Sequence, residues 1–240
     1  MKLKEKVAIV TGSNSGIGKA IATALAREGV DVVITARRQK ENQKLAEDLA
    51  KRFGVKTQAI EADISKEADC ERIVKETIKL LGTIHILVNN AGIGGGSLMA
   101  TTTTREFDQV LKTNLYGTFW CSRAAYRQMQ KNKPMTGEPR GMIINISSVA
   151  GKMAWAGTGT YSASKFGVLA LTQALADEGK KDNIKATAIC PGMVATPMTG
   201  KRGPDYLQPE DCAETVLYLT RLSPAAWLTE IVLDRKGASE

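Results

Sequence analysis

The sequence predicts an α/β fold, a single domain over residues 1–240 with a doubly wound parallel sheet covered by helices on both faces. Short runs of β-branched and aliphatic residues alternate with longer amphipathic stretches along the whole chain, which is typical of consecutive strand–helix–strand units. A length of 240 residues, of which 43% are hydrophobic, can bury one large core but is short for two full domains.

Strands and helices are expected to alternate along the chain. The strands are predicted at residues 7–10, 32–35, 57–60, 86–88, 142–146 and 185–189, with a last strand inside 227–237. The helices are predicted at residues 18–28, 41–52, 66–81, 104–130 and 161–180. Gly29 and Gly54 follow helical patterns at positions where glycine commonly ends a helix. Residues 132–140 and 200–209 are rich in turn residues, and the segment near 198–209 is expected to form a short substrate lid.

Composition excludes several classes of protein. The net charge is +8, but Lys and Arg are interleaved with acidic residues at 39–52 and 65–80, which is typical of solvated helix faces rather than of a nucleic-acid-binding surface. The four cysteines form no CxxC pair and have no histidine cluster nearby, so neither a disulfide framework nor a metal site is expected. No apolar stretch approaches the ~18 residues of a membrane span. We expect a cytoplasmic protein that binds neither nucleic acid nor membrane.

A glycine-rich loop follows the first predicted strand and opens the first predicted helix. Its residues are Gly12, Ser13, Asn14, Ser15, Gly16, Ile17 and Gly18. In this context the backbone N–H groups and the helix dipole face a pyrophosphate, and glycine permits a tight turn and close approach of the backbone to phosphate. Taken alone, the loop also fits a purely structural turn. After a strand and before a helix, it predicts a dinucleotide site in a Rossmann-like fold.

The end of the second predicted strand indicates which dinucleotide binds. The strand leads into Arg37 and Arg38, where NAD-binding proteins place a carboxylate for the ribose 2′-hydroxyl. A guanidinium there can instead bind the 2′-phosphate of NADP, so NADP(H) is predicted over NAD(H), with Arg37 as the first candidate. Both arginines also fit solvated charges at a strand end. Asp63 and Ile64 follow the third strand, where Asp63 either accepts from the adenine amino group or caps the next helix.

Tyr161 and Lys165 lie four residues apart and so share one face of a predicted helix. A neighbouring ammonium favours the phenolate form of tyrosine and lowers its pKa toward the range useful for general acid and base chemistry. Such a pair is also common on surface helices. Ser148, just after a strand, and Asn114, within a long helical stretch, are further polar residues in apolar surroundings.

Together these motifs resemble the short-chain dehydrogenase/reductase family, and in particular its 3-oxoacyl-[acyl-carrier-protein] reductase-like members. The matching residues follow the family's order over nearly the full chain: the glycine-rich loop, Asn89, Asn90, Ala91, Gly92, Asn114, Ser148, Tyr161, Lys165, Pro191, Gly192 and Thr196. The resemblance implies hydride transfer between NADP(H) and a small-molecule carbonyl or secondary alcohol. Reduction is the expected direction, because cytosolic NADP pools are usually kept reduced.

The resemblance also implies a role for each matching residue. Tyr161 would donate and accept the proton, while Ser148 would hydrogen-bond the substrate carbonyl. Lys165 would bind the nicotinamide ribose and lower the pKa of Tyr161, and Asn114 would hold a water in a proton relay. The cofactor would further contact Asn90, Ala91, Gly92, Tyr161, Lys165, Pro191, Gly192, Val194 and Thr196.

The substrate stays open at this point. A 3-oxoacyl thioester, a sugar, a polyol or a pteridine would each fit, and a non-catalytic NADP(H)-binding regulatory protein is a different class, since fold alone does not establish catalysis. Arg127 matches a basic docking position for acyl carrier protein, but Asp177 reverses the charge at a second one, so this partner is unsupported. His85 is the single histidine and is not expected to be catalytic, because Tyr161 fills the acid/base role.

A homodimer or homotetramer is expected, because the resemblance implies subunit contacts through the two long helices around Asn114 and Tyr161. Apolar residues on those helices fit either a subunit contact or the monomer's own core: Phe119, Ala124, Leu169 and Ala170.

Overall fold

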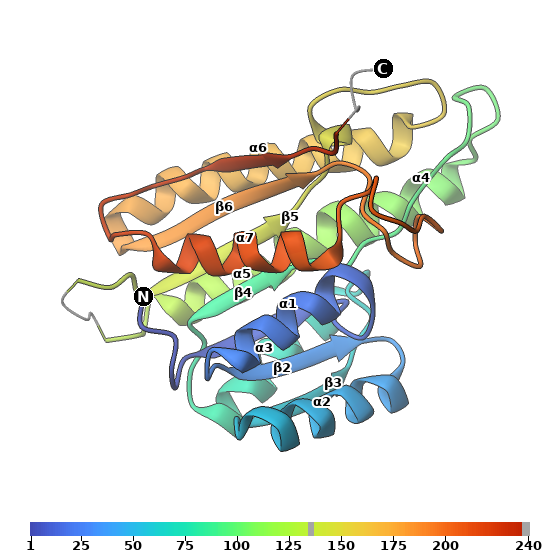
Figure 1. Cartoon of the computed structure of the whole chain (residues 1–240). Helices are drawn as coiled ribbons and strands as arrows, with labels where there is room; N and C mark the ends of the chain where they lie inside the picture. Colours follow the sequence, from blue (N-terminus) through green and yellow to red (C-terminus); the bar gives the residue numbers. More distant parts are fainter. Residues whose placement is uncertain (134–136, 237–240) are drawn as a thin grey trace.

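The strands of the computed structural model form one seven-stranded sheet in the order β3-β2-β1-β4-β5-β6-β7 (Figure 1). The structure describes residues 1–133 and 137–236. The strands are β1 (Val7–Thr11), β2 (Asp31–Ala36), β3 (Thr57–Glu61), β4 (Ile86–Asn89), β5 (Gly141–Ile146), β6 (Ile184–Pro191) and β7 (Glu230–Leu233). Every neighbouring pair is parallel. The predicted α/β Rossmann-like fold is confirmed, and its strand order reverses between β1 and β4, where such sheets bind ligands.

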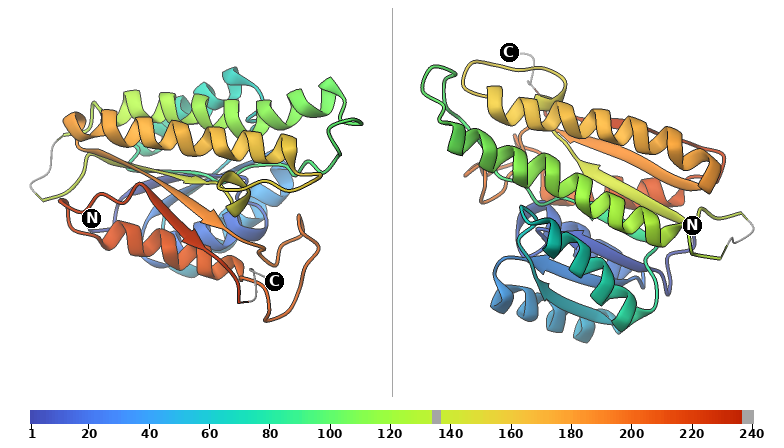
Figure 2. Two further views of the ribbon diagram at one scale, coloured as in Figure 1. Left: turned by 90° about the horizontal axis from the view of Figure 1, so that it is seen from above. Right: turned by 180° about the vertical axis from the view of Figure 1, so that it is seen from behind.

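Helices cover both faces of the sheet. They are α1 (Gly16–Arg27), α2 (Gln39–Phe53), α3 (Glu67–Leu81), α4 (Thr104–Leu111), α5 (Gly117–Met129), α6 (Gly159–Asp182) and α7 (Pro209–Arg221). The first core lies between the sheet and α1, α2 and α7, and the second lies between the sheet and α3, α5 and α6 (Figure 2). In β4, Ile86 and Val88 enter the first core and Leu87 the second, because successive strand residues point to opposite faces. Burial on both faces explains why the strands are nearly continuous apolar runs.

The segment 104–129 is helical as predicted, but it is not α-helical at its centre. A π-helical turn, Lys112–Tyr116, separates α4 from α5. Asn114 lies in this turn, where its side-chain amide is hydrogen-bonded to the main chain of Ile93. Single wide turns of this kind frequently occur at functional sites, and no residue pattern in the segment announces one.

Helix α7 is missing from the sequence-based expectation, although its start carries a recognisable signal. Pro209 occupies the first turn, and Gln208 and Asp211 form a reciprocal capping box. The helix then buries Val216 and Leu217 against the first core. The turn-rich segment before it, 200–208, is irregular as predicted. The other irregular prediction, 132–140, includes residues 134–136, which lie outside the described residues.

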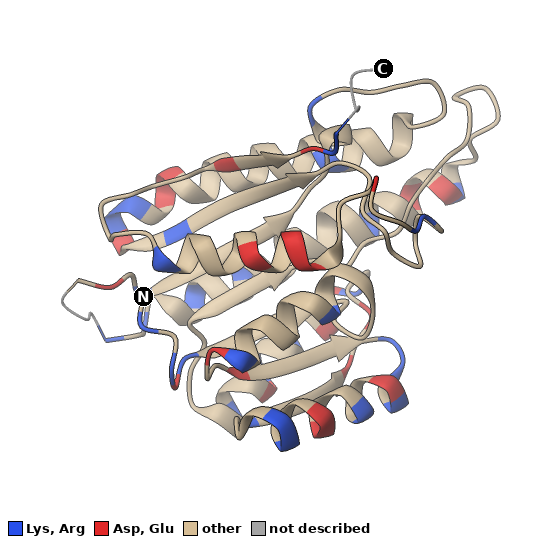
Figure 3. Cartoon of the chain, in the orientation of Figure 1, with Lys and Arg blue, Asp and Glu red and all other residues tan. Residues whose placement is uncertain are grey.

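Charged residues of both signs lie along the peripheral helices (Figure 3). On α2, for example, Arg52 pairs with Asp48 at 3.0 Å, and both side chains are exposed. Among the helices that the structure describes, none combines the length and apolar character needed to cross a membrane.

The residues expected at a subunit contact divide between core and surface. Ala124 and Leu169 are buried within the chain itself, whereas Phe119 and Ala170 are exposed. The exposed pair lies on α5 and α6. Assembly into a homodimer or homotetramer stays a prediction.

His85 precedes β4 at the end of the strand opposite the switch-point edge. Its Nδ1 accepts a hydrogen bond from the Val7 amide at 3.0 Å. Burial, followed by the nearby Lys6 ammonium, lowers the pKa of His85 to about 4, and Glu138, which is ion-paired with Lys6, opposes this shift. The histidine therefore acts as a neutral structural acceptor between β4 and β1.

This neutral histidine should make the protein less stable as the pH falls. An unfolded histidine binds a proton near pH 6.5, whereas folded His85 stays neutral down to about pH 4, so acid favours unfolding between these values. Because the ring is only partly buried, we expect a loss of about 1–2 kcal/mol between pH 7 and pH 5. Urea denaturation at the two pH values measures it. The His85→Gln variant keeps a hydrogen-bond acceptor for the Val7 amide but has no group that titrates in this range, so its stability should fall less between the two pH values. An equal loss of stability in the variant and the wild type would contradict the prediction.

Candidate functional site

The glycine-rich loop adopts a conformation that requires glycine. Gly12 and Gly16 have φ angles of +63° and +51°, which lie in the left-handed region. A β-carbon on Gly12 would lie 2.8 Å from the Cα atom of Ala91, so the loop also lies against the end of β4. Ser15 is the N-cap of α1, and its side chain makes no capping hydrogen bond. The first amides of α1 are therefore available to an anion.

Two residues of the loop support it from behind. Ser13 is fully buried, and its hydroxyl accepts a hydrogen bond from the Thr35 amide at 2.9 Å. A β-carbon on Gly18 would collide with the Gly12 carbonyl and the Asn90 amide, which shows how closely α1 packs against the loop. Neither residue lines the pocket described below. Their observed contacts are to protein, so both residues support the loop, and direct contact of Ser13 or Gly18 with the cofactor stays a prediction.

The segment after β4, which begins with Asn90, is hydrogen-bonded to the end of β1 and the start of the glycine-rich loop. The Asn90 side-chain amide donates to the carbonyls of Thr11 at 2.9 Å and Gly12 at 3.2 Å. The Thr11 hydroxyl in turn accepts from the amides of Asn90 and Ala91, each at 3.0 Å. Asn90 and Ala91 thus fix the shape of the phosphate loop while lining the pocket, together with Gly92.

The two arginines at the end of β2 differ in what they contact. Arg38 donates to the Asn14 side chain at 3.3 Å and pairs with Glu41 at 3.4 Å. Arg37 is exposed and lines the pocket, and within the described residues it has no hydrogen bond or ion pair. Nearby, the Thr35 hydroxyl is buried on the pocket wall without a hydrogen-bond partner among those residues. The pocket therefore offers one unpaired cation and one unpaired hydroxyl at this end.

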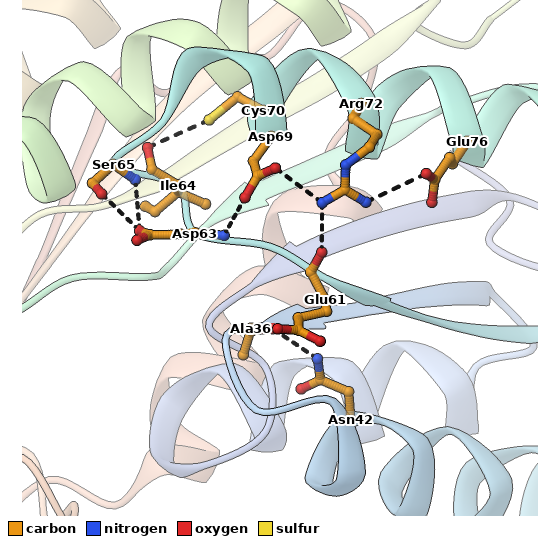
Figure 4. A network of polar contacts seen from close by, with 10 residues as sticks. All are labelled: Ala36, Asn42, Glu61, Asp63, Ile64, Ser65, Asp69, Cys70, Arg72 and Glu76. Atoms are coloured by element: carbon orange, nitrogen blue, oxygen red, sulfur yellow. Dashed lines mark hydrogen bonds and ion pairs between the residues drawn. The ribbon is translucent and has the colours of Figure 1, made fainter.

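A polar network fixes the loop after β3, which carries Asp63 and Ile64 (Figure 4). Asp63 Oδ1 accepts from the amide and the hydroxyl of Ser65, at 3.1 and 2.7 Å. The Asp63 amide donates to Asp69 at 2.8 Å, and Arg72 ties Asp69 to the Glu61 carbonyl. Asp63 therefore does cap the local turn, and among the described residues its other carboxylate oxygen has no hydrogen-bond partner that would compete with an adenine amino group. Both Asp63 and Ile64 line the pocket.

The proposed acid and its neighbours come from two elements. Tyr161 and Lys165 lie on α6, and Ser148 follows β5. The Lys165 ammonium is buried, donates to the Ile146 carbonyl at 2.8 Å and lies 5.7 Å from the centre of the Tyr161 ring. The Ser148 hydroxyl accepts from the Ala150 amide at 3.1 Å. All three side chains face one pocket.

The electrostatics of this group differ from the expectation in one respect. Burial raises the pKa of Tyr161, and a hydrogen bond with Ser148 acts against that rise. Burial also lowers the pKa of Lys165 to about 8. The rise is opposite in direction to the predicted lowering of the Tyr161 pKa by Lys165, whose ammonium is not among its causes.

Asn114 braces the wall of the site from outside the pocket. Its Oδ1 accepts from the Ile93 amide at 2.8 Å, and its Nδ2 donates to the Ile93 carbonyl at 2.9 Å and to Ser164 at 3.1 Å. A β-carbon on Gly92 would lie 3.2 Å from that Oδ1 and 3.7 Å from the Lys165 nitrogen. Both amide hydrogens are used, so Asn114 is a positioning residue in this structure, and its place in a proton relay stays a prediction.

The loop after β6 closes the other side of the site. Val194 forms a bridge with Leu207, and Thr199 donates to the Val194 carbonyl at 2.7 Å. A β-carbon on Gly16 would lie 3.3 Å from the Thr196 methyl group. This loop therefore touches the phosphate loop although the two are far apart in sequence.

These segments enclose one pocket of about 350 Å³ at the carboxyl edge of the sheet. Every predicted site residue lines it except Ser13, Gly18 and Asn114. Sequence reasoning misses Thr35, Ala36, Ala62, Ile93, Thr113, Ile146, Ser147, Pro197, Met198 and Thr199. Most of these residues directly flank predicted ones at the ends of strands. Their position next to a predicted strand end could therefore have identified them as pocket residues. Among the residues described, no three His, Cys, Asp or Glu side chains gather as metal ligands would, and all four cysteines are free and buried.

Comparison with known proteins agrees with this geometry. A family model described as short chain dehydrogenase matches residues 6–207. The chain is 35% identical over 250 residues to a 3-oxoacyl-[acyl-carrier-protein] reductase FabG from Aquifex aeolicus, covering 99% of this chain and 98% of that protein. A 3-oxoacyl-[acyl-carrier-protein] reductase from Synechocystis is 34% identical over 239 residues, covering 95% and 94%. An alcohol dehydrogenase from the archaeon Thermococcus sibiricus, complexed with 5-hydroxy-NADP, has a TM-score of 0.87 at 28% identity, covering 95% of each chain.

Proposed function

Because this chain belongs to the short-chain dehydrogenase family and is an oxidoreductase of that family, we propose that it is an NADPH-dependent reductase that converts a carbonyl to a secondary alcohol. One observation carries the proposal. A single pocket joins the free Arg37, the amides of the phosphate loop, and the Ser148, Tyr161 and Lys165 side chains. The cofactor end and the acid end therefore belong to one continuous site.

The residues of this pocket fit NADPH. The uncapped amides at the start of α1 suit a pyrophosphate, and the backbone of Gly12 and Gly16 leaves room where any side chain would intrude. The unpartnered Thr35 hydroxyl and the unpaired Arg37 guanidinium supply a donor and a charge near the end of β2, where a 2′-phosphate is expected. Unlike Arg37, Arg38 is already engaged. NADPH, when bound, would supply the hydride for reduction.

The chain's own residues would orient the carbonyl and move the proton. Ser148 would donate a hydrogen bond to the carbonyl oxygen, and Tyr161 would transfer its phenolic proton to that oxygen as negative charge develops there. Two N–H donors of Lys165 remain beyond the one that binds the Ile146 carbonyl, and these would hold ribose hydroxyls. Asn114 would keep the wall beside Gly92 and Lys165 in place.

The pKa of Tyr161 favours reduction over oxidation at neutral pH. Because burial raises this pKa above its ordinary value of 10.0, the phenol is protonated throughout the neutral range and is ready to donate. Oxidation of an alcohol would need the phenolate as the base, which forms only at higher pH.

A second candidate is the reduction of 3-oxoacyl thioesters, which the relatives named as 3-oxoacyl-[acyl-carrier-protein] reductases favour. Arg127 is exposed and has no ion pair within the described part of the chain, as a docking residue would need. Asp177, however, is acidic and pairs with Lys180 at 2.8 Å. Repulsion of an acidic carrier at this position disfavours the carrier-bound form of the substrate.

Oxidation of NADPH and of NADH by the purified protein tests the proposal. The carbonyl panel would contain an acetoacetyl thioester, simple ketones, diketones and quinones. We expect turnover with a strong preference for NADPH. A preference for NADH would overturn the choice of cofactor, and tight NADPH binding without turnover of any carbonyl would favour a non-catalytic binding protein.

A further inference from the structure

Three loops lie at the end of the sheet toward which the strands point (Figure 1), and residues of the first and third line the pocket. They are residues 93–103 before α4, residues 152–158 before α6 and residues 192–208 before α7. The first loop lies against the start of α6. The Met99 sulfur lies 2.8 Å from the position that a β-carbon on Gly159 would take, and Gly159 begins the helix that carries Tyr161. These loops therefore border the space from which a substrate reaches Tyr161.

Large apolar side chains are exposed on all three loops. Met99 is 73% exposed, Met198 is 61% exposed and Trp155 is 49% exposed. We call the whole set the apolar rim; it consists of Leu98, Met99, Met153, Trp155, Met193 and Met198. Met198 also lines the pocket, so the rim continues the site outward. Apolar side chains that stay in water next to a binding site gain free energy when a ligand covers them.

The first two of these loops carry no unpaired charge. Residues 93–103 contain no charged side chain, as Figure 3 shows by the uniform tan of this loop. In the second loop the one charged residue, Lys152, pairs with Glu230 at 2.7 Å. In the third loop the charged residues follow Met198, and Lys201 lies 5.8 Å from the centre of the Tyr206 ring. The two loops that carry Met99 and Trp155 therefore offer no unpaired counter-charge of their own to a charged group on a substrate.

We propose that the substrate is an uncharged carbonyl compound with an apolar chain or ring beside the carbonyl, which the apolar rim covers. This inference rests on the reductase function proposed above and names its substrate class. Sugars and other small polyols have little apolar surface and would gain little free energy from contact with the apolar rim. Flexible methionines suit a range of apolar shapes, so the rim selects for apolar area rather than for one outline.

A series of ethyl esters tests the proposal with the carbonyl chemistry held constant. Ethyl acetoacetate, ethyl 3-oxohexanoate and ethyl 3-oxooctanoate differ only in the length of the apolar chain, and acetoacetate carries a carboxylate in place of the ester. Full burial of one CH₂ corresponds to about a fourfold gain, so partial cover by the rim should raise kcat/KM by about twofold per methylene. We expect acetoacetate to be the poorest substrate. Equal rates along the series, or a preference for acetoacetate or for sugars, would overturn the proposal.

Two matched variants test whether the apolar rim causes the dependence of kcat/KM on chain length. Trp155 and Leu80 are each 49% exposed, but Leu80 lies on α3, away from the three loops. We expect Trp155→Ala to lower kcat/KM for ethyl 3-oxooctanoate about tenfold and for ethyl acetoacetate about twofold, which flattens the series. Leu80→Ala should leave the series unchanged. An unchanged series in Trp155→Ala together with Met99→Ala would overturn the assignment.

Binding without turnover separates this inference from the reductase function. Protein saturated with NADP⁺ cannot reduce the esters, and quenching of tryptophan fluorescence follows their binding, with Trp155→Phe identifying the responding residue. Affinity that rises with chain length supports the apolar rim even if no carbonyl is reduced, a result that would overturn the proposed function alone. Affinity independent of chain length would overturn the inference while turnover of polar carbonyls upheld the reductase.

Discussion

The Tyr161→Phe variant is expected to reduce carbonyl substrates about a thousandfold more slowly than the wild type, with nearly unchanged affinity for NADPH. The substitution removes the phenolic proton but keeps the ring that fills the space beside Lys165. A thousandfold loss corresponds to about 4 kcal/mol in the activation free energy, which is in the range of a lost general acid. Steady-state rates and a fluorescence titration with NADPH measure the two quantities separately.

A second tyrosine provides the control. The Tyr126 hydroxyl donates to Asp182 at 2.7 Å on the far part of α5 and α6, so Tyr126→Phe also removes a hydroxyl and a hydrogen bond. It should lower stability slightly and leave kcat unchanged. Retained turnover in Tyr161→Phe would show that another group protonates the product. A large loss of NADPH affinity in that variant would mean that the tyrosine acts through the cofactor site.

The pH dependence of the wild type gives an independent check on Tyr161. Because burial raises its pKa, the acid stays protonated from neutral pH upward to at least its ordinary value of 10.0. Reduction should therefore not decline through loss of this proton near pH 7. Lys165, whose pKa is lowered to about 8, loses its charge first, so a decline that begins near pH 8 would report the lysine.

The sequence predicts the strands and the phosphate loop well because local rules determine them. A strand that is buried on both faces of the sheet needs a continuous apolar run. The left-handed backbone conformation at Gly12 and Gly16 favours glycine, which is visible in the sequence. Helix α7 could also have been recognised from Pro209 and the capping residues around it. The turn-rich residues 200–208 directly before this helix concealed its start.

Other features depend on contacts that no local pattern contains. The Lys165 ammonium binds the carbonyl of Ile146, which is 19 residues away in the chain and comes from a neighbouring strand. The brace between Asn114 and Ile93 likewise joins residues 21 apart. The contacts of Ser13 with the Thr35 amide and of Gly18 with Asn90 also join distant parts of the chain. The exposed apolar rim arises only when three loops meet at one edge of the sheet.

The choice between Arg37 and Arg38 illustrates the same limit and leads to the second large effect. Both residues follow β2, and their sequence neighbours do not distinguish them. In the structure Arg38 contacts Asn14 and Glu41, whereas Arg37 extends from the pocket wall without a partner in the described residues. An unpaired guanidinium loses no existing ion pair when it binds a phosphate, which favours Arg37 as the ligand.

Arg37→Ala should therefore weaken the binding of NADPH about 30-fold, or about 2 kcal/mol, and leave the binding of NADH nearly unchanged. Titrations with NADPH, NADH, 2′,5′-ADP and 5′-AMP measure this, since the two members of each pair differ only in the 2′-phosphate. The effect should shrink at high salt, because Arg37 is exposed.

Arg38→Ala is the matched control, since it removes the same charge from the adjacent position. We expect a smaller loss of NADPH affinity, about threefold, because Arg38 shares its guanidinium with Glu41 and acts mainly on the loop through Asn14. A larger loss in Arg38→Ala than in Arg37→Ala would exchange their roles. Equal losses of NADPH and NADH affinity in Arg37→Ala would mean that this residue does not read the 2′-phosphate, and the preference for NADP(H) would then need another source.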